Sequence, residues 1–253
     1  MQGPDTQLNQ QAEPERHSIA QSIALHLLPG TLPTLAFHLA VREVLQRFGL
    51  TEELIYLLLG NVLVFYPTLW CVLFYYARRR GNTGLSLEGI VVYQHKTSIW
   101  KTIRWSLLIL MLVGPIFLLL EPVTNHIQSY FGWYPIQVDS MHDDKSSRLT
   151  LVLAFFVSLA TTALMTPITE EYYYRGFLLP RMPKALGRAG PGVHSLLFAV
   201  SHFHQPWMIP VRTIGLLPLI YVTRITRSLR PGIVSHCLVN GADIIIATLG
   251  RLR

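Results

Sequence analysis

From Leu149 to Thr169 the chain reads LTLVLAFFVSLATTALMTPIT, a run without Asp, Glu, Lys or Arg. A helix needs about 20 consecutive apolar residues to cross the hydrocarbon core of a bilayer, so this run is long enough to span a membrane. Similar charge-free runs occupy residues 18–41, 54–77, 105–120 and 189–211. Because lipid offers no hydrogen bonds to the backbone, such spans must be helical. The sequence therefore predicts an all-α, polytopic transmembrane helical bundle.

The composition and the placement of charges agree with a membrane protein. Hydrophobic residues make up 51% of the chain and charged residues only 14%, which is unusual for a soluble domain. The net charge of +7 raises the alternative of nucleic-acid binding. However, the lysines and arginines cluster at residues 78–104, 181–188 and 224–230, whereas the loop at 121–148 carries three aspartates. This positive-inside pattern predicts that the partner is the lipid bilayer and that the basic loops are cytoplasmic.

We expect about seven spans, with six to eight as the range, because the hydrophobic peaks merge near the C-terminus. The predicted division is a disordered cytoplasmic tail at 1–17, N-terminal spans and loops at 18–148, and a C-terminal transmembrane core at 149–253. The first span contains Pro29, Gly30 and Pro33, which predict a kink or a break. The predicted spans lie near residues 18–41, 54–77, 103–120, 149–179, 192–208, 209–222 and 231–250.

Polar residues within the predicted core form three short motifs. Ionisable groups at membrane depth are costly, so each needs a partner or a function. At about 100° per residue, Glu171 and Arg175 share one helix face, while Glu170 is turned away from Arg175 by about 140°. Arg212 and Asp243 also lie in or near the last two spans. The motifs are Glu170-Glu171-x-x-x-Arg175, Phe198-x-x-x-His202 and His236-x-x-x-Asn240.

These residue types suit the hydrolysis of a peptide bond. Glu170, left without a cationic partner, is a candidate general base that takes a proton from water, and His202 could share the water or pass its proton to the leaving amine. His236 and Asn240 lie one turn apart and could both donate to the developing oxyanion. With the basic loops inside, these groups converge on the cytoplasmic half of the membrane. We therefore predict an active site toward the cytoplasmic side.

The three ordered motifs resemble those of the CPBP family, which comprises type II CAAX prenyl endopeptidases and related bacterial intramembrane proteases, some linked to bacteriocin self-immunity. The resemblance covers about Leu149 to Gly250. It implies that Glu170 and His202 activate the water, that His236 and Asn240 stabilise the oxyanion, and that Glu171 and Arg175 support the site. Phe198 belongs to the second motif. The implied substrate is a membrane-associated or lipidated protein, prenylated CAAX proteins being the best-known case.

Several alternatives accompany this interpretation. Glu170, His202 and His236 could instead hold a divalent metal such as zinc with an open position, which would make the enzyme a metalloprotease; direct activation of water is favoured, with no other cofactor. The polar groups could also serve a non-enzymatic transporter or an immunity-type scaffold. Asn240 could simply tie helices together. Structural roles are expected for the remaining aromatic and imidazole groups of the spans, with the tyrosines at the membrane interface: Tyr172, Tyr173, Tyr174, His26, His38, His194 and His204.

Overall fold

The computed structural model describes residues 14–40, 56–134 and 148–251. Most of the described residues are helical, and they contain no β-strand. They do contain one isolated antiparallel bridge, between Gln94 and Ser228. The predicted all-α bundle is confirmed. Most of the predicted cytoplasmic tail lies outside the described residues, and the division into domains stays a prediction.

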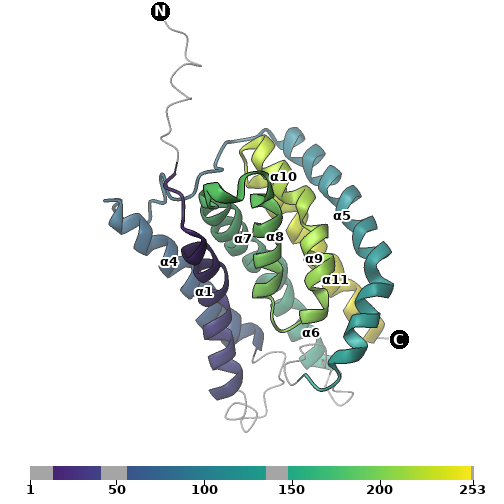
Figure 1. Cartoon of the computed structure of the whole chain (residues 1–253). Helices are drawn as coiled ribbons and strands as arrows, with labels where there is room; N and C mark the ends of the chain where they lie inside the picture. Colours follow the sequence, from purple (N-terminus) through teal and green to yellow (C-terminus); the bar gives the residue numbers. More distant parts are fainter. Residues whose placement is uncertain (1–13, 41–55, 135–147, 252–253) are drawn as a thin grey trace, which may run out of the picture.

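The helices follow one another as antiparallel rods, with α7 and α8 between α1 and α4 on one side and α5 and α11 on the other (Figure 1). The first half of the chain contains α1 (Ile19–Ala40), a π-helical segment (Tyr56–Phe65) that runs into α4 (Tyr66–Arg79), and α5 (Ile99–Gln128), which ends in a short turn (Ser129–Phe131). The second half contains α6 (Arg148–Ser158), α7 (Thr166–Glu170), α8 (Gly190–Ser201), α9 (Ile209–Gly215), α10 (Leu217–Thr226) and α11 (Arg230–Arg251).

One long helix runs through the middle of the bundle, as the sequence predicts. It begins with α6, continues through α7, and ends in a 3-10 turn at Leu179–Arg181 just before Pro183. Two π-helical segments interrupt its regular geometry, Leu159–Met165 and Glu171–Leu178. Such wide turns often occur at functional sites, and the second one carries the motif that starts at Glu170 and Glu171.

Five helical stretches among the described residues are long and apolar enough to cross a membrane, and a shorter apolar helix covers residues 19–32. On α5 the side chains of Met111, Leu118 and Leu119 are 70–77% exposed, as expected for a surface that faces lipid. The predicted fifth span differs from the structure. It was placed at residues 192–208, but α8 ends at Ser201 and the chain turns back through Pro206–Met208 into α9. The turn therefore lies within the bundle.

Proline decides how α1 packs on the central helix. α1 runs through Pro29 without a break in the helix. Because Pro29 has no N–H, the carbonyl of Leu25 one turn earlier has no helical donor. The Tyr173 hydroxyl donates to that carbonyl at 2.8 Å, and the Tyr174 hydroxyl donates to the His26 carbonyl at 3.3 Å. The central helix thus satisfies a backbone group that the proline leaves open.

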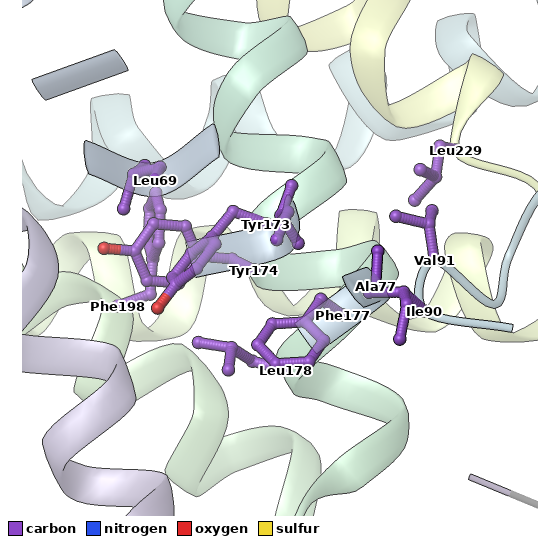
Figure 2. Close-up of a cluster of buried hydrophobic side chains, with 11 residues drawn as sticks. Leu69, Ala77, Ile90, Val91, Tyr173, Tyr174, Phe177, Leu178, Phe198 and Leu229 are labelled. Atoms are coloured by element: carbon purple, nitrogen blue, oxygen red, sulfur yellow. The ribbon is translucent and has the colours of Figure 1, made fainter. Parts of the chain in front are cut away.

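The main hydrophobic core surrounds the second half of the central helix (Figure 2). Tyr173 and Tyr174 are 0% and 1% exposed, so the expected interface position of these tyrosines is wrong. They are buried because their hydroxyls find acceptors inside the bundle. At Gly176 a Cβ atom would lie 2.6 Å from the Val91 side chain, so only glycine lets the loop before α5 pack here. The cluster contains Leu69, Leu73, Ala77, Ile90, Val91, Tyr173, Tyr174, Phe177, Leu178, Phe198 and Leu229.

The basic ends of several helices meet at one end of the bundle. The Arg181 guanidinium donates to the carbonyls of Ile90 and Phe177, each at 2.8 Å. The Arg230 guanidinium donates to the Thr97 carbonyl at 2.9 Å. In Figure 1 this is the upper end, where α5 and α11 begin. The basic loops that the sequence assigns to one side of the membrane are therefore neighbours in the fold.

Candidate functional site

Glu170 lies between two imidazole rings from other helices. Its Oε1 is 3.7 Å from Nε2 of His202, and its Oε2 is 3.9 Å from Nε2 of His236. Glu170 is 3% exposed, and the two histidine side chains are 20% and 14% exposed. These separations exceed a direct hydrogen bond but suit a bridging water. Three side chains predicted from separate motifs thus meet at one point.

Each of the three side chains occupies a place that the local chain determines. Glu170 ends α7, which begins at Thr166 with Pro167 in its first turn. His202 follows the last residue of α8, where its backbone leaves the helical region (φ −85°, ψ 49°). His236 lies in the second turn of α11. Residues from the middle of the central helix, from the end of α8 and from the start of α11 therefore converge. This convergence requires the turn after α8 to lie inside the bundle.

In each histidine ring, the hydrogen-bond partner of Nδ1 determines whether Nε2 carries a lone pair or a hydrogen. His202 Nδ1 lies 2.9 Å from the Phe198 carbonyl, which can only accept, so Nδ1 carries the hydrogen. His236 Nδ1 lies 3.1 Å from Oε1 of Glu171, and a carboxylate likewise accepts. In a neutral ring, Nε2 then holds a lone pair that faces Glu170. His202 is thereby prepared to accept a proton from a water molecule.

Glu171 and Arg175 form the fully buried support that the spacing predicts. Their side chains are both 0% exposed, and Arg175 Nη1 lies 3.5 Å from Glu171 Oε1. The Arg175 guanidinium also stacks on the Phe198 ring, 4.0 Å from its centroid, a favourable cation–π geometry. At Gly232 a Cβ atom would come within 3.0 Å of Glu171 Oε2. The start of α11 therefore approaches the carboxylate closely because it has no side chain there.

The charges of the cluster are not balanced by the salt bridge alone. Glu170 and Glu171 are both buried, and Arg175 supplies one positive charge between them. An uncompensated buried charge is costly. The His236 ring lies close to both carboxylates. Its Nε2 faces Glu170, so a hydrogen on this nitrogen would point toward the reaction centre.

Asn240 lies one turn after His236, but its amide is engaged elsewhere. Its Nδ2 donates to the Thr162 carbonyl at 2.9 Å, in the first π-helical segment of the central helix. This contact matches the helix-tying alternative for Asn240. The second hydrogen of the amide is left for another acceptor. The predicted role in the oxyanion site stays a prediction.

Other histidines in the bundle form a separate contact. His26 Nδ1 lies 2.6 Å from the Ser22 carbonyl, and His26 Nε2 lies 2.8 Å from Nδ1 of His194. Both rings are 0% exposed. The pair joins α1 to α8, as expected for structural residues. His38 lies in α1 among side chains that are not described.

Sequence reasoning missed several residues that shape the site. Gly232 and Thr162 make close contacts with Glu171 and Asn240, yet neither has a chemical signature. Arg212 was noted as a polar residue of a short span without a role. Its guanidinium donates to the Gln205 side chain, in the turn that follows His202. A cation at membrane depth was the available signal.

The zinc alternative at Glu170, His202 and His236 stays a prediction. The donor types suit zinc, and Nδ1 of each ring has a hydrogen-bond partner of the kind typical of zinc ligands. Among the described residues, no group of three or more His, Cys, Asp or Glu side chains is placed to hold an ion.

Comparison with known proteins finds a family match in the second half of the chain. Residues 152–242 match the family model described as type II CAAX prenyl endopeptidase Rce1-like. The matched segment contains all three motifs, from Glu170 to Asn240. No curated protein and no solved structure matches the chain.

Proposed function

We propose that this protein is an intramembrane endopeptidase in which Glu170 and His202 activate a water molecule. The match of residues 152–242 to the type II CAAX prenyl endopeptidase Rce1-like family model supports this proposal and is consistent with a CPBP family protease. The observation that carries the proposal is the position of Glu170, buried and 3.7 Å from an imidazole nitrogen that faces it. A membrane environment and a protein or peptide substrate follow from the family. The steps below assign a role to each side chain.

In the first step a water molecule bridges Glu170 and His202. It donates one hydrogen to the Glu170 carboxylate and the other to Nε2 of His202, whose Nδ1–H is held by the Phe198 carbonyl. As the water oxygen bonds to the peptide carbonyl carbon, Glu170 takes the proton. A carboxylate removed from bulk water suits this exchange, since it is poorly solvated and close to its reacting partner.

In the second step the carbonyl oxygen becomes an oxyanion. His236, protonated and held by Glu171 at 3.1 Å, directs Nε2–H toward it. The free hydrogen of the Asn240 amide is the second donor. A preorganised donor in a site with little water stabilises developing charge strongly. Arg175 keeps Glu171 in place, so that this carboxylate orients His236 instead of reacting itself.

In the third step the peptide bond breaks. The C–N bond of the tetrahedral intermediate is cleaved, and the leaving nitrogen takes up the proton that water gave to Glu170. His202 lies beside Glu170 and can relay this proton through Nε2. The products are a carboxylic acid and an amine, and Glu170 returns to its carboxylate form. No further reagent is required.

The position of the site favours a substrate that enters from the basic side of the membrane. Glu170 precedes Arg181, the basic end of the same helix, by a distance of roughly 15 Å at the α-helical rise. A lipidated substrate would be held at this side by its anchor. We therefore propose an active site toward the cytoplasmic side and a membrane-associated or lipidated protein or peptide as substrate, with CAAX-type processing as one case.

The test is cleavage by the purified protein in proteoliposomes. Lipidated and unlipidated peptide libraries are incubated with the wild type and with Glu170→Gln, which keeps the size of the side chain. We expect cleavage by the wild type and none by the variant, while both elute identically from a sizing column. Equal cleavage by both would overturn the mechanism. Absence of any cleavage, with transport or partner binding intact, would favour the non-enzymatic alternative.

A further inference from the structure

Arg212 is a cation in the interior of the bundle that the proposed steps do not use. It lies one turn into α9, within the membrane-spanning stretch 206–226, and it is half-buried. Its guanidinium donates to the side chain of Gln205, and Gln205 N donates to the His202 carbonyl at 3.0 Å. The cation is thus connected to the turn that carries His202. Ionisable groups at this depth usually serve a function.

The packing of α9 holds Arg212 in a defined place. Ser195 on α8 donates to the Thr213 carbonyl at 2.7 Å. On the other side, a Cβ atom at Gly215 would lie 2.4 Å from the Phe117 ring of α5. α9 is therefore held closely between α8 and α5. A guanidinium on such a clamped turn is preorganised to bind an anion at little entropic cost.

The contacts of Arg212 place it beside the turn that carries His202. Its guanidinium donates to the Gln205 side chain, and Gln205 N donates to the His202 carbonyl. The Arg212 charge also acts on both His202 and Glu170. A guanidinium at this turn is near enough to contact the part of a substrate that lies next to His202.

His202 is the group that relays a proton to the leaving nitrogen in the proposed mechanism, on which this inference rests. The part of the substrate that follows the cleaved bond would then lie on the His202 side of the reaction centre. We propose that Arg212 is a specificity-determining residue that binds a carboxylate in the leaving fragment of the substrate. Guanidinium and carboxylate form paired, charge-assisted hydrogen bonds of matching geometry. The carboxylate is either the free C-terminus of the substrate or an acidic side chain near the cleaved bond.

Asp243 provides an internal check on this assignment. It is exposed on α11, and the Arg212 charge acts on it. This carboxylate would compete with a substrate carboxylate for the same cation. Removing the charge of Asp243 should therefore strengthen substrate selection, whereas removing that of Arg212 should abolish it. Opposite effects from two substitutions are hard to obtain from a structural role alone.

The experiment uses three synthetic peptides of one sequence that the wild type cleaves: a free acid, a C-terminal amide, and an amide with one glutamate in the leaving fragment. The full-length protein in proteoliposomes is compared with Arg212→Gln, Arg212→Lys and Asp243→Asn. We expect the wild type to prefer at least one carboxylate peptide over the plain amide by about 10- to 100-fold in kcat/KM, the range of a hydrogen bond to a charged group. The preference should lie mainly in KM.

Arg212→Gln should lose this preference, Arg212→Lys should restore part of it, and Asp243→Asn should enlarge it. The peptide that Arg212→Gln ceases to distinguish identifies the source of the carboxylate. A wild type that cleaves all three peptides equally would overturn the inference while leaving the proposed endopeptidase intact. A preference that survives in Arg212→Gln would overturn it as well. Loss of all cleavage in Glu170→Gln reports separately on the proposed function.

Discussion

The central helix faces two different polar environments. Toward α8 and α11 it presents charged groups: Glu170, Glu171 and Arg175, with His202 and His236 beside them. Toward α1 it presents the Tyr173 and Tyr174 hydroxyls, which meet backbone carbonyls. The first environment, the reaction-centre face, concentrates charge where it is costly. In the second, the α1 face, each of these backbone carbonyls accepts a hydrogen bond from a neutral hydroxyl.

The difference shows how buried groups that take part in a reaction can be told from buried groups that only hold helices together. A neutral hydroxyl that donates to a carbonyl contributes about 1 kcal/mol to stability and changes little during a reaction. Buried charges need partners and respond to proton movement. We therefore expect substitutions on the reaction-centre face to affect turnover or to destabilise strongly. Those on the α1 face should affect stability alone, and modestly.

The largest contrast is between two buried histidines of the same helical region. His202→Ala removes the proton relay, so kcat should fall by about 10²- to 10⁴-fold, measured with a cleaved peptide in proteoliposomes. His194→Ala removes only the contact with His26 and should keep most of kcat while lowering the melting temperature. Equal losses of kcat in the two variants would erase the distinction between the faces.

The salt bridge beneath the reaction centre should show the next largest effect. Arg175→Met leaves Glu171 buried without its guanidinium, and breaking a buried pair costs about 3–5 kcal/mol of folding free energy. Adding Glu171→Leu removes the stranded charge and should recover part of that loss without restoring activity, because His236 loses its partner. The measurement is thermal unfolding in detergent with parallel peptide assays. A double variant less stable than Arg175→Met would contradict the pairing.

Asn240 sharpens the comparison because two roles are considered for its amide, stabilising the oxyanion and tying two helices together. Its amide donates to the Thr162 carbonyl, so Asn240→Ala should cost about 1–3 kcal/mol of stability by leaving that carbonyl unpaired. If its second hydrogen also serves the oxyanion, kcat should fall by at least about 100-fold. Stability and kcat measured on the same preparation separate the two roles. An unchanged kcat would confine Asn240 to tying helices.

On the α1 face, Tyr173→Phe should destabilise by about 1–3 kcal/mol, because the Leu25 carbonyl then has no donor. Pro29→Ala supplies a helical N–H for that carbonyl. The double variant should therefore be more stable than Tyr173→Phe alone. Thermal unfolding of the three variants measures this, and kcat should stay near that of the wild type. Strictly additive losses would show that the proline and the tyrosine are not linked.

The smallest expected effect is a pH dependence at the start of α1. Burial, and then the Arg181 charge, lower the pKa of His17 from 6.5 to about 4. A histidine whose folded pKa is lowered contributes its full stability above pH 6.5, and that contribution is lost as pH falls toward 4. Proteolysis of the N-terminal segment should therefore become faster from pH 7 to 5. His17→Gln should flatten this dependence, and an unchanged slope would refute it.

Much of the fold and of the site could be predicted from local patterns. Charge-free runs predict membrane helices because lipid accepts no unpaired backbone group. One-turn spacing predicts the pairing of Glu171 with Arg175, which the structure confirms at 3.5 Å. The buried tyrosines could not be predicted, because their acceptors lie about 150 residues away in sequence on a helix whose proline has freed a carbonyl. The early end of α8 was missed for a similar reason, since hydrophobicity alone does not reveal a turn inside an apolar run.

The sequence alone determined the class of the protein, the order of its helices and the side chains available for chemistry, because these depend on composition and on neighbours within one helical turn. Only the tertiary structure decided which nitrogen of each imidazole faces Glu170, where the Asn240 amide donates, and that Arg212 is connected through Gln205 to the turn that carries His202. These features arise from contacts between helices that are distant along the chain. Such contacts depend on how the helices pack together, and no local pattern encodes that packing.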